Sequence, residues 1–368
     1  MRIAVLSAAR SVHTVRWVNA LAARGHEVEL YSLSAHKAPY DDFDRSVGIN
    51  YINGSGAAGY YFGARKLAEL LHEFSPDVLS AHYATGYGTM ARRCAVRPLL
   101  LSVWGADVYD FPEKGAINRR IVCRNLEAAD AIASTSEIMA KRVKELCGEK
   151  TIYITPFGVD TQIFSPASGV RTGPVTIGTV KALEPKYGIE YLVKAFAMLR
   201  SRLTREGKMP EEGIRLVVCG DGGRRAALET LAKELGISDC VTFVGKIPHD
   251  AVPDAIRGFD IFCSPSVLDS ESFGVSAVEA MACGVPVVTS DVDGFREVVS
   301  DRETGFIVPR RDQVSLSNRL YELCIDAQLR TLMGAAGRRR VIEKYEWRDC
   351  VCAMEEALRL TAENGDKR

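Results

Sequence analysis

The segment Glu271–Pro286 constrains this chain more than any other part of its sequence. It reads Glu-Ser-Phe-Gly-Val-Ser-Ala-Val-Glu-Ala-Met-Ala-Cys-Gly-Val-Pro, so Glu271 and Glu279 stand eight positions apart with a glycine between them. A helix that begins near Gly274 would direct its unpaired backbone N–H groups and its positive dipole end toward the preceding residues. Such an end attracts phosphate, and carboxylates accept hydrogen bonds from hydroxyls. The pattern therefore fits a nucleoside diphosphate sugar, in which phosphates lie between two hydroxylated ends.

The same segment resembles the Glu-x7-Glu motif of retaining glycosyltransferases with the GT-B fold, a group that includes glycogen-synthase-like and lipid-sugar transferases. The Phe-Gly-Val context after the first glutamate and residues 279–288 carry the resemblance. It implies an α/β protein with two Rossmann-like, doubly wound domains, an interdomain cleft and a C-terminal helix that crosses back. It also implies that Glu271 contacts sugar hydroxyls and Glu279 the ribose. The remaining donor-binding groups of this segment would come from Ser272, Phe273, Gly274 and Val275.

The composition and charge of the chain exclude several classes of protein. Its 368 residues allow two domains with separate cores, and its formal net charge of zero gives no electrostatic basis for nucleic-acid binding. No apolar run reaches the ~18 residues of a membrane span, and Met1–Ser7 fits a first strand rather than a signal peptide. The ten cysteines are scattered without a CxxC pair, which predicts free thiols rather than zinc or disulfides. We therefore expect a cytoplasmic protein.

Short aliphatic runs alternate with helical stretches along the chain, which is the pattern of parallel sheets covered on both faces. The first run leads into a helical stretch that ends at Gly25, and a second run follows at once. The expected strands are residues 2–6, 27–32, 78–81, 99–103, 131–134, 151–154, 175–180, 215–219, 241–244, 261–264, 287–289 and 305–308.

Residues 164–174 have the composition of a linker, and the alternating pattern restarts after them. We therefore expect an acceptor-binding domain at residues 1–168 and a donor-binding domain at residues 169–345. Residues 346–368 should form the returning helix and a polar tail. Two such domains, joined near residue 170, would face each other across a cleft at the C-terminal ends of their strands.

Lys181 and Lys186 lie five positions apart on the loop that follows strand 175–180. Open α/β sheets bind ligands at this end of their strands, and two ammonium groups there can clamp a diphosphate. The pair resembles the Arg…Lys pair of the family, with Lys181 where an arginine is usual. That difference loses bidentate geometry but keeps the charge. Two solvated surface lysines remain the alternative interpretation.

Two further loops fit nucleotide binding. Gly220 and Gly222 lie in a strand-to-helix turn, where glycine lets the backbone approach a nucleotide closely. The turn lacks the third glycine of a dinucleotide fingerprint and resembles the Gly-x-Gly loop of the family instead. Lys246 and Ile247 follow strand 241–244, and in relatives this loop covers the base.

The two lysines and the helix end near Gly274 would supply positive charge to the diphosphate, so we expect neither a metal nor another cofactor beyond the nucleotide sugar as co-substrate. Asp291 and Asp293 have the letters of an Asp-x-Asp motif, but they precede Gly294 where the family has a capping loop. We interpret them as structural.

A hydrolase with two catalytic carboxylates is an alternative use of Glu271 and Glu279. Retaining glycosidases hold their carboxyl groups about 5 Å apart across one bond. Eight positions around a helix start place these two at different points along a longer ligand, which favours the nucleotide sugar.

Arg10, His13 and Arg16 occupy the first strand-to-helix crossing, where relatives often carry a Gly-Gly loop that this chain lacks. These side chains are candidates to bind an acceptor phosphate. An ordinary helix surface explains them equally well.

Trp104 begins a Trp-Gly-Ala-Asp stretch that resembles the His-Gly-x-Asp stretch of the family, with tryptophan in place of the histidine. Tryptophan donates only one N–H or stacks on a sugar face. The resemblance leaves Asp107 to position the acceptor hydroxyl. His82 follows a neighbouring strand and is a further acceptor-binding candidate, although lone histidines are more often structural.

Residues 60–66 and 118–124 each combine apolar and basic side chains. Such runs suit a membrane interface and fit the lipid-linked acceptors that are frequent in this family. They also fit solvated helix faces. The protein is therefore expected in the cytoplasm, with peripheral contact to the inner face of the cell membrane left open.

These observations favour a retaining, metal-independent glycosyltransferase. It would move a hexose from a nucleoside diphosphate sugar to a hydroxyl of a glycan or lipid-linked acceptor, as in cell-surface polysaccharide biosynthesis. Two alternatives remain at this point, a catalytically silent nucleotide-sugar-binding protein and a nucleotide-sugar epimerase.

Overall fold

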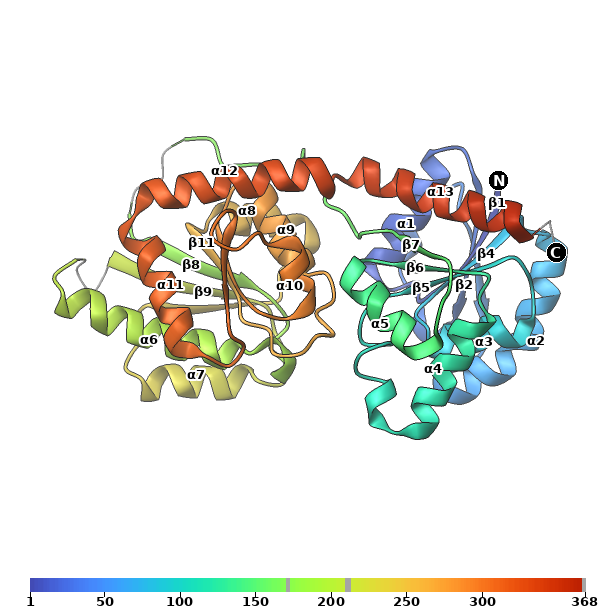
Figure 1. Ribbon diagram of the computed structural model, residues 1–368, viewed down its shortest axis with the longest axis horizontal. Helices are drawn as coiled ribbons and strands as arrows, with labels where there is room; N and C mark the ends of the chain where they lie inside the picture. Colours follow the sequence, from blue (N-terminus) through green and yellow to red (C-terminus); the bar gives the residue numbers. More distant parts are fainter. Residues whose placement is uncertain (170–172, 209–212, 366–368) are drawn as a thin grey trace. The chain divides into compact units, whose positions relative to one another are not determined.

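The computed structural model of the chain describes residues 1–169, 173–208 and 213–365 (Figure 1). They form two compact units, one made of Met1–Phe157 with the residues from Arg348 onward, and one made of Gly158–Trp347. Each unit has one parallel sheet between layers of helices. The prediction of two Rossmann-like, doubly wound α/β domains is confirmed.

The sheet of the first unit has the strand order β3-β2-β1-β4-β5-β6-β7. The chain builds outward from β1 in one direction, then returns to the other side of β1 with β4, so its topological switch point lies between these two strands. The strands are β1 (Arg2–Leu6), β2 (Glu27–Leu33), β3 (Gly48–Ile52), β4 (Val78–His82), β5 (Leu99–Val103), β6 (Ala131–Ser134) and β7 (Ile152–Ile154). The helices are α1 (Val12–Ala23), α2 (Gly56–Phe74), α3 (Gly86–Cys94), α4 (Ala116–Ala128), α5 (Glu137–Cys147) and α13 (Trp347–Gly365).

The second unit repeats this plan with the strand order β10-β9-β8-β11-β12-β13 and a switch point between β8 and β11. Its strands are β8 (Val175–Val180), β9 (Ile214–Cys219), β10 (Val241–Gly245), β11 (Ile261–Ser264), β12 (Val287–Ser290) and β13 (Gly305–Val308). Its helices are α6 (Ile189–Arg205), α7 (Arg225–Glu234), α8 (Val252–Arg257), α9 (Val275–Ala282), α10 (Asp293–Val298), α11 (Gln313–Ile325) and α12 (Ala327–Lys344).

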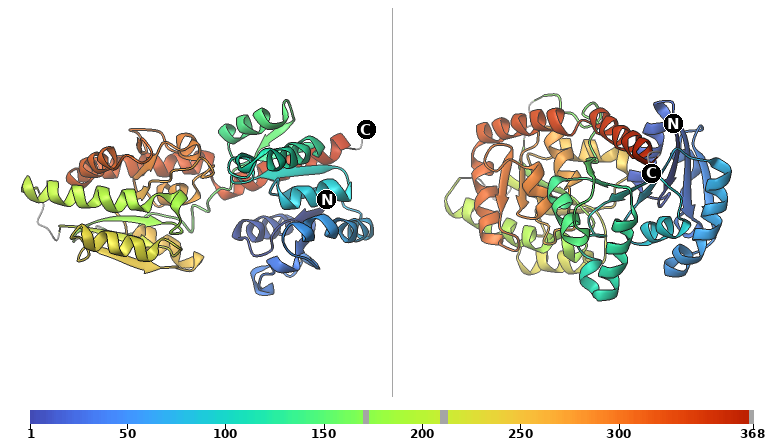
Figure 2. Two further views of the ribbon diagram at one scale, coloured as in Figure 1. Left: turned by 90° about the horizontal axis from the view of Figure 1, so that it is seen from below. Right: turned by 45° about the vertical axis from the view of Figure 1, so that its right-hand side comes forward.

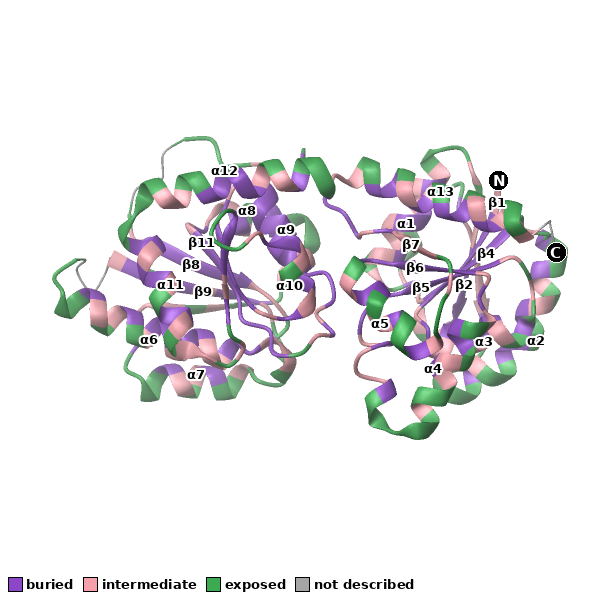
Figure 3. Ribbon diagram, viewed as in Figure 1, coloured by how far each residue is buried: buried purple, intermediate pink, exposed green. Residues whose placement is uncertain are grey.

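Helices cover both faces of each sheet (Figure 2). In the second unit α6 packs against α7 and α11, whereas α9 packs against α8, α10 and α12. In the first unit α2, α3, α4 and α5 pack in sequence along one face. Because both faces are covered, inner strands such as β1, β4, β5, β11 and β12 are buried along almost their whole length, which explains their continuous aliphatic sequences (Figure 3). No helix of the described residues has the length and hydropathy to cross a membrane.

The boundary between the units lies before residue 168. The Val159 N–H donates to the Tyr345 carbonyl at 2.8 Å, and the Trp347 N–H donates to the Val159 carbonyl at 3.0 Å. The Arg257 guanidinium also binds the Ser165 carbonyl. These bonds fix Val159 and Ser165 to the second unit, which begins at Gly158 by its compactness, against the limit of 168 expected from the sequence. The join expected near residue 170 falls at residues 170–172, outside the described part.

The helix α13 belongs to the first unit and continues to Gly365. The last residues of the expected tail, 366–368, are outside the described part. One carboxylate, Glu355, fixes it to the turn after α1. Its Oε2 lies 2.6 Å from an Arg24 nitrogen and its Oε1 lies 2.7 Å from His26 Nε2. Burial opposes ionisation of Glu355, but the bonds from Arg24 and His26 outweigh burial and hold its pKa below the usual range.

We predict that Glu355→Gln destabilises the first unit by about 1 kcal/mol at neutral pH, since the variant keeps the shape but loses the charge. A carboxylate with a depressed folded pKa stabilises the fold above its unfolded pKa of about 4.3, and the contribution disappears as the pH falls through the folded pKa. Denaturant unfolding of both proteins at several pH values measures this. The exposed Glu127→Gln of the same unit serves as the control, and a Glu355→Gln deficit that persists unchanged in acid contradicts the assignment.

Candidate functional site

The switch point of the second sheet brings two predicted residues together. Lys181 follows β8 and Glu271 follows β11, and these strands are neighbours. Lys181 Nζ lies 2.8 Å from Glu271 Oε2, and only 9% and 11% of the two side chains are exposed. The Ser266 hydroxyl also reaches the same oxygen, at 3.4 Å. An ion pair therefore stands where doubly wound sheets bind their ligands.

Close backbone packing holds the loops of this pair in place. Gly220 has φ +143°, and a Cβ built on it would lie 1.8 Å from the Lys181 carbonyl oxygen. Gly188 has φ +61°, and its Cβ would lie 2.3 Å from the Pro265 carbonyl oxygen. The Val267 N–H donates to the Lys186 carbonyl at 2.8 Å. Only glycine permits these approaches, so the sequence itself sets the position of both loops.

The two predicted lysines gather around one ring. Lys181 Nζ lies 5.1 Å from the centroid of Tyr187, and Lys186 Nζ lies 4.7 Å from the same centroid. The ring attracts both cations, while the two ammonium groups repel each other. A diphosphate bound between them would relieve that repulsion.

The helix α9 begins beside this pair. Gly274 is its N-cap with φ +75°, and glycine has no side chain with which to cap the helix. A Cβ at Gly274 would lie 2.5 Å from the Phe295 ring, and a Cβ at Gly294 would lie 2.2 Å from the Glu271 carbonyl oxygen. The predicted helix start is therefore correct, and tight packing presents its backbone rather than side chains to the site.

The remaining residues predicted to bind the donor lie near the start of α9, and several of them are buried. Ser272 and Phe273 are buried, and the Phe273 ring packs edge-on against Tyr345 at 5.4 Å, so their contribution to a ligand is limited to backbone. Val275 is the first residue of α9. Glu279 lies on α9 and is 5% exposed.

The loops after β9 and β10 adjoin each other. The Gly220 N–H donates to the Gly245 carbonyl at 2.7 Å, and this bond places Lys246 and Ile247 beside the glycine turn that contains Gly222. Lys246 is exposed and Ile247 is half-buried. The structure thus groups both predicted nucleotide loops at one edge of the sheet.

Arg310 was not found by sequence analysis, because nothing local to it marks a role. Its guanidinium binds both oxygens of Asp269 at 3.0 and 2.9 Å and Asp291 Oδ1 at 3.1 Å. The Asp293 N–H donates to Asp269 as well, at 3.1 Å. Burial opposes the charge of Asp291, but Arg310 outweighs burial and lowers its pKa. The geometry supports the structural interpretation of Asp291 and Asp293, whose network steadies the loop before Glu271.

The switch point of the first sheet carries a cavity of about 230 Å³. Arg10, His82 and Trp104 line it, so the structure brings these three predicted residues together. His13 and Arg16 are outside its lining. The His13 ring instead stacks on Phe157, with centroids 4.0 Å apart, and meets Trp104 edge-on at 5.7 Å.

Sequence analysis missed other residues of this cavity, among them His36, Tyr60 and Tyr87. The Tyr87 hydroxyl shares a hydrogen bond of 2.8 Å with His36 Nδ1. A Cβ at Gly86 would lie 2.3 Å from the Tyr60 ring, so this glycine lets the ring lie against the cavity. Only the fold joins these residues, which come from three separate loops and helices.

Asp107 is fully buried, and its carboxylate accepts from the backbone N–H groups of Ala84 at 2.7 Å, Trp104 at 3.0 Å and Gly105 at 2.8 Å. Burial raises its pKa against the opposing effect of these bonds. Three backbone donors thus already occupy this carboxylate, and its contact with an acceptor hydroxyl stays a prediction. The residue positions the turn that holds Trp104.

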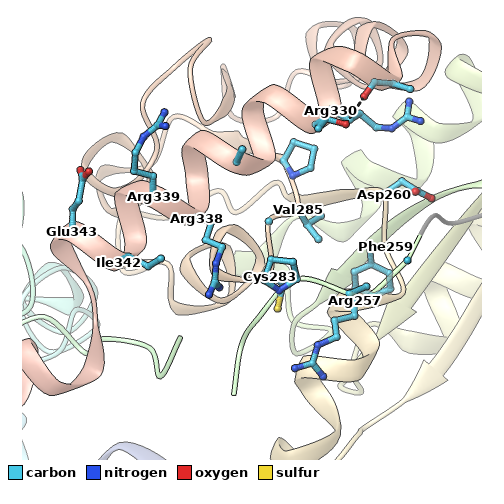
Figure 4. Close-up of a pocket in the computed structure, with 18 residues that line it drawn as sticks. Arg257, Phe259, Asp260, Cys283, Val285, Arg330, Arg338, Arg339, Ile342 and Glu343 are labelled. Atoms are coloured by element: carbon cyan, nitrogen blue, oxygen red, sulfur yellow. Dashed lines mark hydrogen bonds between the residues drawn. The ribbon is translucent and has the colours of Figure 1, made fainter. Parts of the chain in front are cut away.

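A further cavity of about 830 Å³ in the second unit lies beside α12 (Figure 4). Figure 4 shows the Arg338 side chain extending from α12 toward Cys283. The Arg338 guanidinium binds the carbonyls of Phe164 and Ala282, and Arg257 binds those of Ile163 and Ser165. These arginines thus secure residues 163–165 to the unit, and the chemistry predicted from sequence lies elsewhere.

Comparison with known proteins agrees with this arrangement. The family model described as "Glycosyl transferases group 1" matches residues 160–340, and the model "Glycosyl transferase 4-like" matches residues 2–136. The chain carries the domains of a group 1 glycosyltransferase. The match to residues 160–340 contains the switch point with Lys181 and Glu271, and the match to residues 2–136 contains the first strand-to-helix crossing.

Individual relatives of this glycosyltransferase share less than a third of their aligned residues with it. It is 29% identical over 289 residues to a GDP-mannose-dependent alpha-(1-6)-phosphatidylinositol monomannoside mannosyltransferase of Mycolicibacterium smegmatis, covering 74% of this chain and 72% of the relative. It is 32% identical over 291 residues to a D-inositol 3-phosphate glycosyltransferase of Kribbella flavida, covering 71% of this chain. The match spans 66% of that relative's length, just under two thirds. Sucrose-phosphate synthase from Thermosynechococcus elongatus shares the GT-B fold, with a TM-score of 0.83, 20% identity and 98% coverage of both chains.

We predict that Glu271→Gln and Lys181→Met each destabilise this glycosyltransferase by about 3 kcal/mol, because each leaves one buried charge without its partner. The double variant removes both charges together, so its loss of stability should be smaller than the sum of the two single losses. We expect the difference to be at least about 1 kcal/mol. Denaturant unfolding of the four proteins gives the coupling energy. Strictly additive losses would show that the pair is not coupled.

Proposed function

We propose that this protein is a retaining, metal-independent hexosyltransferase that uses a nucleoside diphosphate sugar and a hydroxyl of a glycan or lipid-linked acceptor. The observation that carries the proposal is the Lys181–Glu271 pair at the second switch point, beside the start of α9. The names of the two relatives, one GDP-mannose-dependent and one acting on inositol phosphate, support a sugar donor and a hydroxylated acceptor.

The residues of the site divide the donor between them. Lys181 and Lys186 hold the diphosphate as two point charges, and the backbone at the start of α9 adds N–H donors. Glu271 accepts from sugar hydroxyls with its carboxylate, which lies against Lys181. Glu279 lies farther along α9, where the ribose end of the donor would extend, and the loops at Gly220 and Lys246 face the base.

The reaction breaks the bond between C1 of the sugar and a β-phosphate oxygen, and it forms a bond between C1 and the acceptor oxygen. Negative charge grows on the departing phosphate, so cations fixed in advance at that position stabilise the transition state. The same phosphate accepts the proton of the attacking hydroxyl on the side that the leaving group vacates. Attack from that side retains the configuration at C1, and the positive groups do the work that a metal does in other transferases.

We predict that Glu271→Gln lowers kcat/KM for transfer at least about 100-fold, because the amide loses the ionised acceptor for sugar hydroxyls. The measurement incubates the protein with UDP-glucose and GDP-mannose and with bacterial lipid extract, in the presence of EDTA. The exposed Glu234→Gln serves as the control. NMR of the product gives the anomeric configuration.

Other outcomes separate the alternatives. Donor binding without product favours a silent binding protein, and interconversion of donors without acceptor favours an epimerase. A product with inverted configuration at C1 contradicts the retaining mechanism. A loss of activity in EDTA contradicts metal independence. A fully active Glu271→Gln protein contradicts the role of that carboxylate.

Contact with a membrane is part of this proposal for a lipid-linked acceptor. Phe62 is 75% exposed on α2, directly after Tyr61, which is 48% exposed. The Arg93 guanidinium lies 3.4 Å from the centroid of the Tyr61 ring, and Arg65 is also exposed. Aromatic rings beside cations are typical of surfaces that bind anionic lipid. Residues 118–124, the other predicted run, lie on α4 of the same sheet face.

We predict that Phe62→Ser weakens binding to phosphatidylglycerol vesicles several-fold, since an inserted aromatic ring contributes buried apolar area. Vesicle co-sedimentation measures the binding. The matched control is Leu332→Ser, another exposed apolar residue, in the second unit. Equal binding by the Phe62→Ser and native proteins would contradict membrane contact through this surface.

A further inference from the structure

The cavity of the first unit lies where two helices begin. β1 and β4 are paired neighbours, and α1 follows β1 while α3 follows β4. Neither N-cap residue, Ser11 or Thr85, makes a side-chain capping hydrogen bond. Gly86, the first residue of α3, lines the cavity. The start of α3 therefore directs positive potential into the cavity, and Arg10, which directly precedes the N-cap of α1, lines it.

The cavity contains one cation and no acid. Arg10 lines it, is exposed, and follows the end of β1. Among the described residues that line the cavity, none is an aspartate or glutamate. Burial and the nearby Arg10 together lower the pKa of His36, so this imidazole is neutral near pH 7 and adds no charge. Arg10 is thus available to pair with an anion.

A buried histidine supplies a second, independent observation. His82 lines the cavity and is 2% exposed, and its Nδ1 has no hydrogen-bond partner. Its Nε2 shares a hydrogen bond of 3.3 Å with the Ser80 hydroxyl. Burial lowers the pKa of His82 to about 3, so the ring is neutral. A buried polar atom without a partner costs free energy unless a ligand satisfies it, and a hydroxyl is a suitable partner.

Aromatic rings complete the walls of the cavity. The Trp104 ring lies 5.1 Å from His82 and 6.3 Å from Tyr83, and Tyr60 lies 5.0 Å from Tyr87. Such walls pack against the C–H face of a saturated ring. The volume of about 230 Å³ equals that of about eight waters, which is enough for one ring and its phosphate but not for an oligosaccharide.

We propose that this cavity binds the phosphate ester of a one-ring polyol as the anionic head of the acceptor, with the phosphate at Arg10 and the start of α3 and a ring hydroxyl at His82. The assignment rests on the proposed transferase function, because it names the acceptor of that reaction. A free sugar or cyclitol phosphate and a phospholipid with such a head share this chemistry.

The test is calorimetric titration of the full chain with myo-inositol 1-phosphate, with myo-inositol and with inorganic phosphate. We expect the ester to bind at least tenfold more tightly than either part alone. Arg10→Gln should weaken the ester at least about tenfold, as expected for loss of a charge-assisted hydrogen bond, and His82→Phe should weaken both the ester and myo-inositol. Arg45→Gln, which removes an exposed arginine outside the cavity, should bind as the native protein does.

Two results would overturn the assignment. One is an Arg10→Gln protein that binds the ester as tightly as the native protein while its melting temperature is unchanged. The other is myo-inositol that binds as tightly as its phosphate. If Arg10→Gln fails to fold, His82→Phe and the comparison of ester with myo-inositol still decide the matter.

Competition experiments distinguish a free phosphate ester from a phospholipid as the source of the bound phosphate ester. Displacement of the ester by vesicles that contain phosphatidylinositol, but not by phosphatidylglycerol vesicles, supports the assignment with a lipid source. Displacement by added soluble ester alone supports it with a free phosphate ester. Failure of the transferase proposal is recognised separately, because Lys181→Met should lose binding of UDP-glucose and GDP-mannose and keep binding of myo-inositol 1-phosphate.

Discussion

One buried ion pair, between Lys181 and Glu271, organises the switch point of the second unit. The two charges come from loops on either side of a switch point, and each would be costly in so dry a place without the other. The pair places an ammonium group and a carboxylate together at one point. Gly220 and Gly188 let the surrounding backbone pack closely enough to hold them there.

The two units share one sheet plan but present different side chains at its switch point. Each sheet reverses its strand order beside its first strand, and the gap between neighbouring strand ends receives helix starts from both sides. In the second unit this place holds two lysines and a carboxylate beside α9, which suits a diphosphate sugar. In the first unit it holds Arg10, His82 and aromatic rings, which suits a smaller anionic acceptor. The two places differ in the residues that their loops and helix starts present.

Local features of the fold were predictable, and long-range partners were not. The helix start at Gly274 could be read from the sequence, because the glycine and the following residues determine it alone. The pairing of Lys181 with Glu271 joins residues 90 positions apart, and only the strand order brings them together. Arg310 was missed for the same reason. Asp107 was assigned a ligand role by resemblance, but its burial under three backbone N–H groups depends on packing that no short motif records.

The most direct test of the account is a crystal structure of the protein with UDP-glucose or GDP-mannose. The account predicts the β-phosphate within hydrogen-bond distance of Lys181 Nζ and of backbone N–H groups at the start of α9, with Glu271 bonded to a sugar hydroxyl. A diphosphate bound elsewhere, with the Lys181–Glu271 pair untouched, would contradict it.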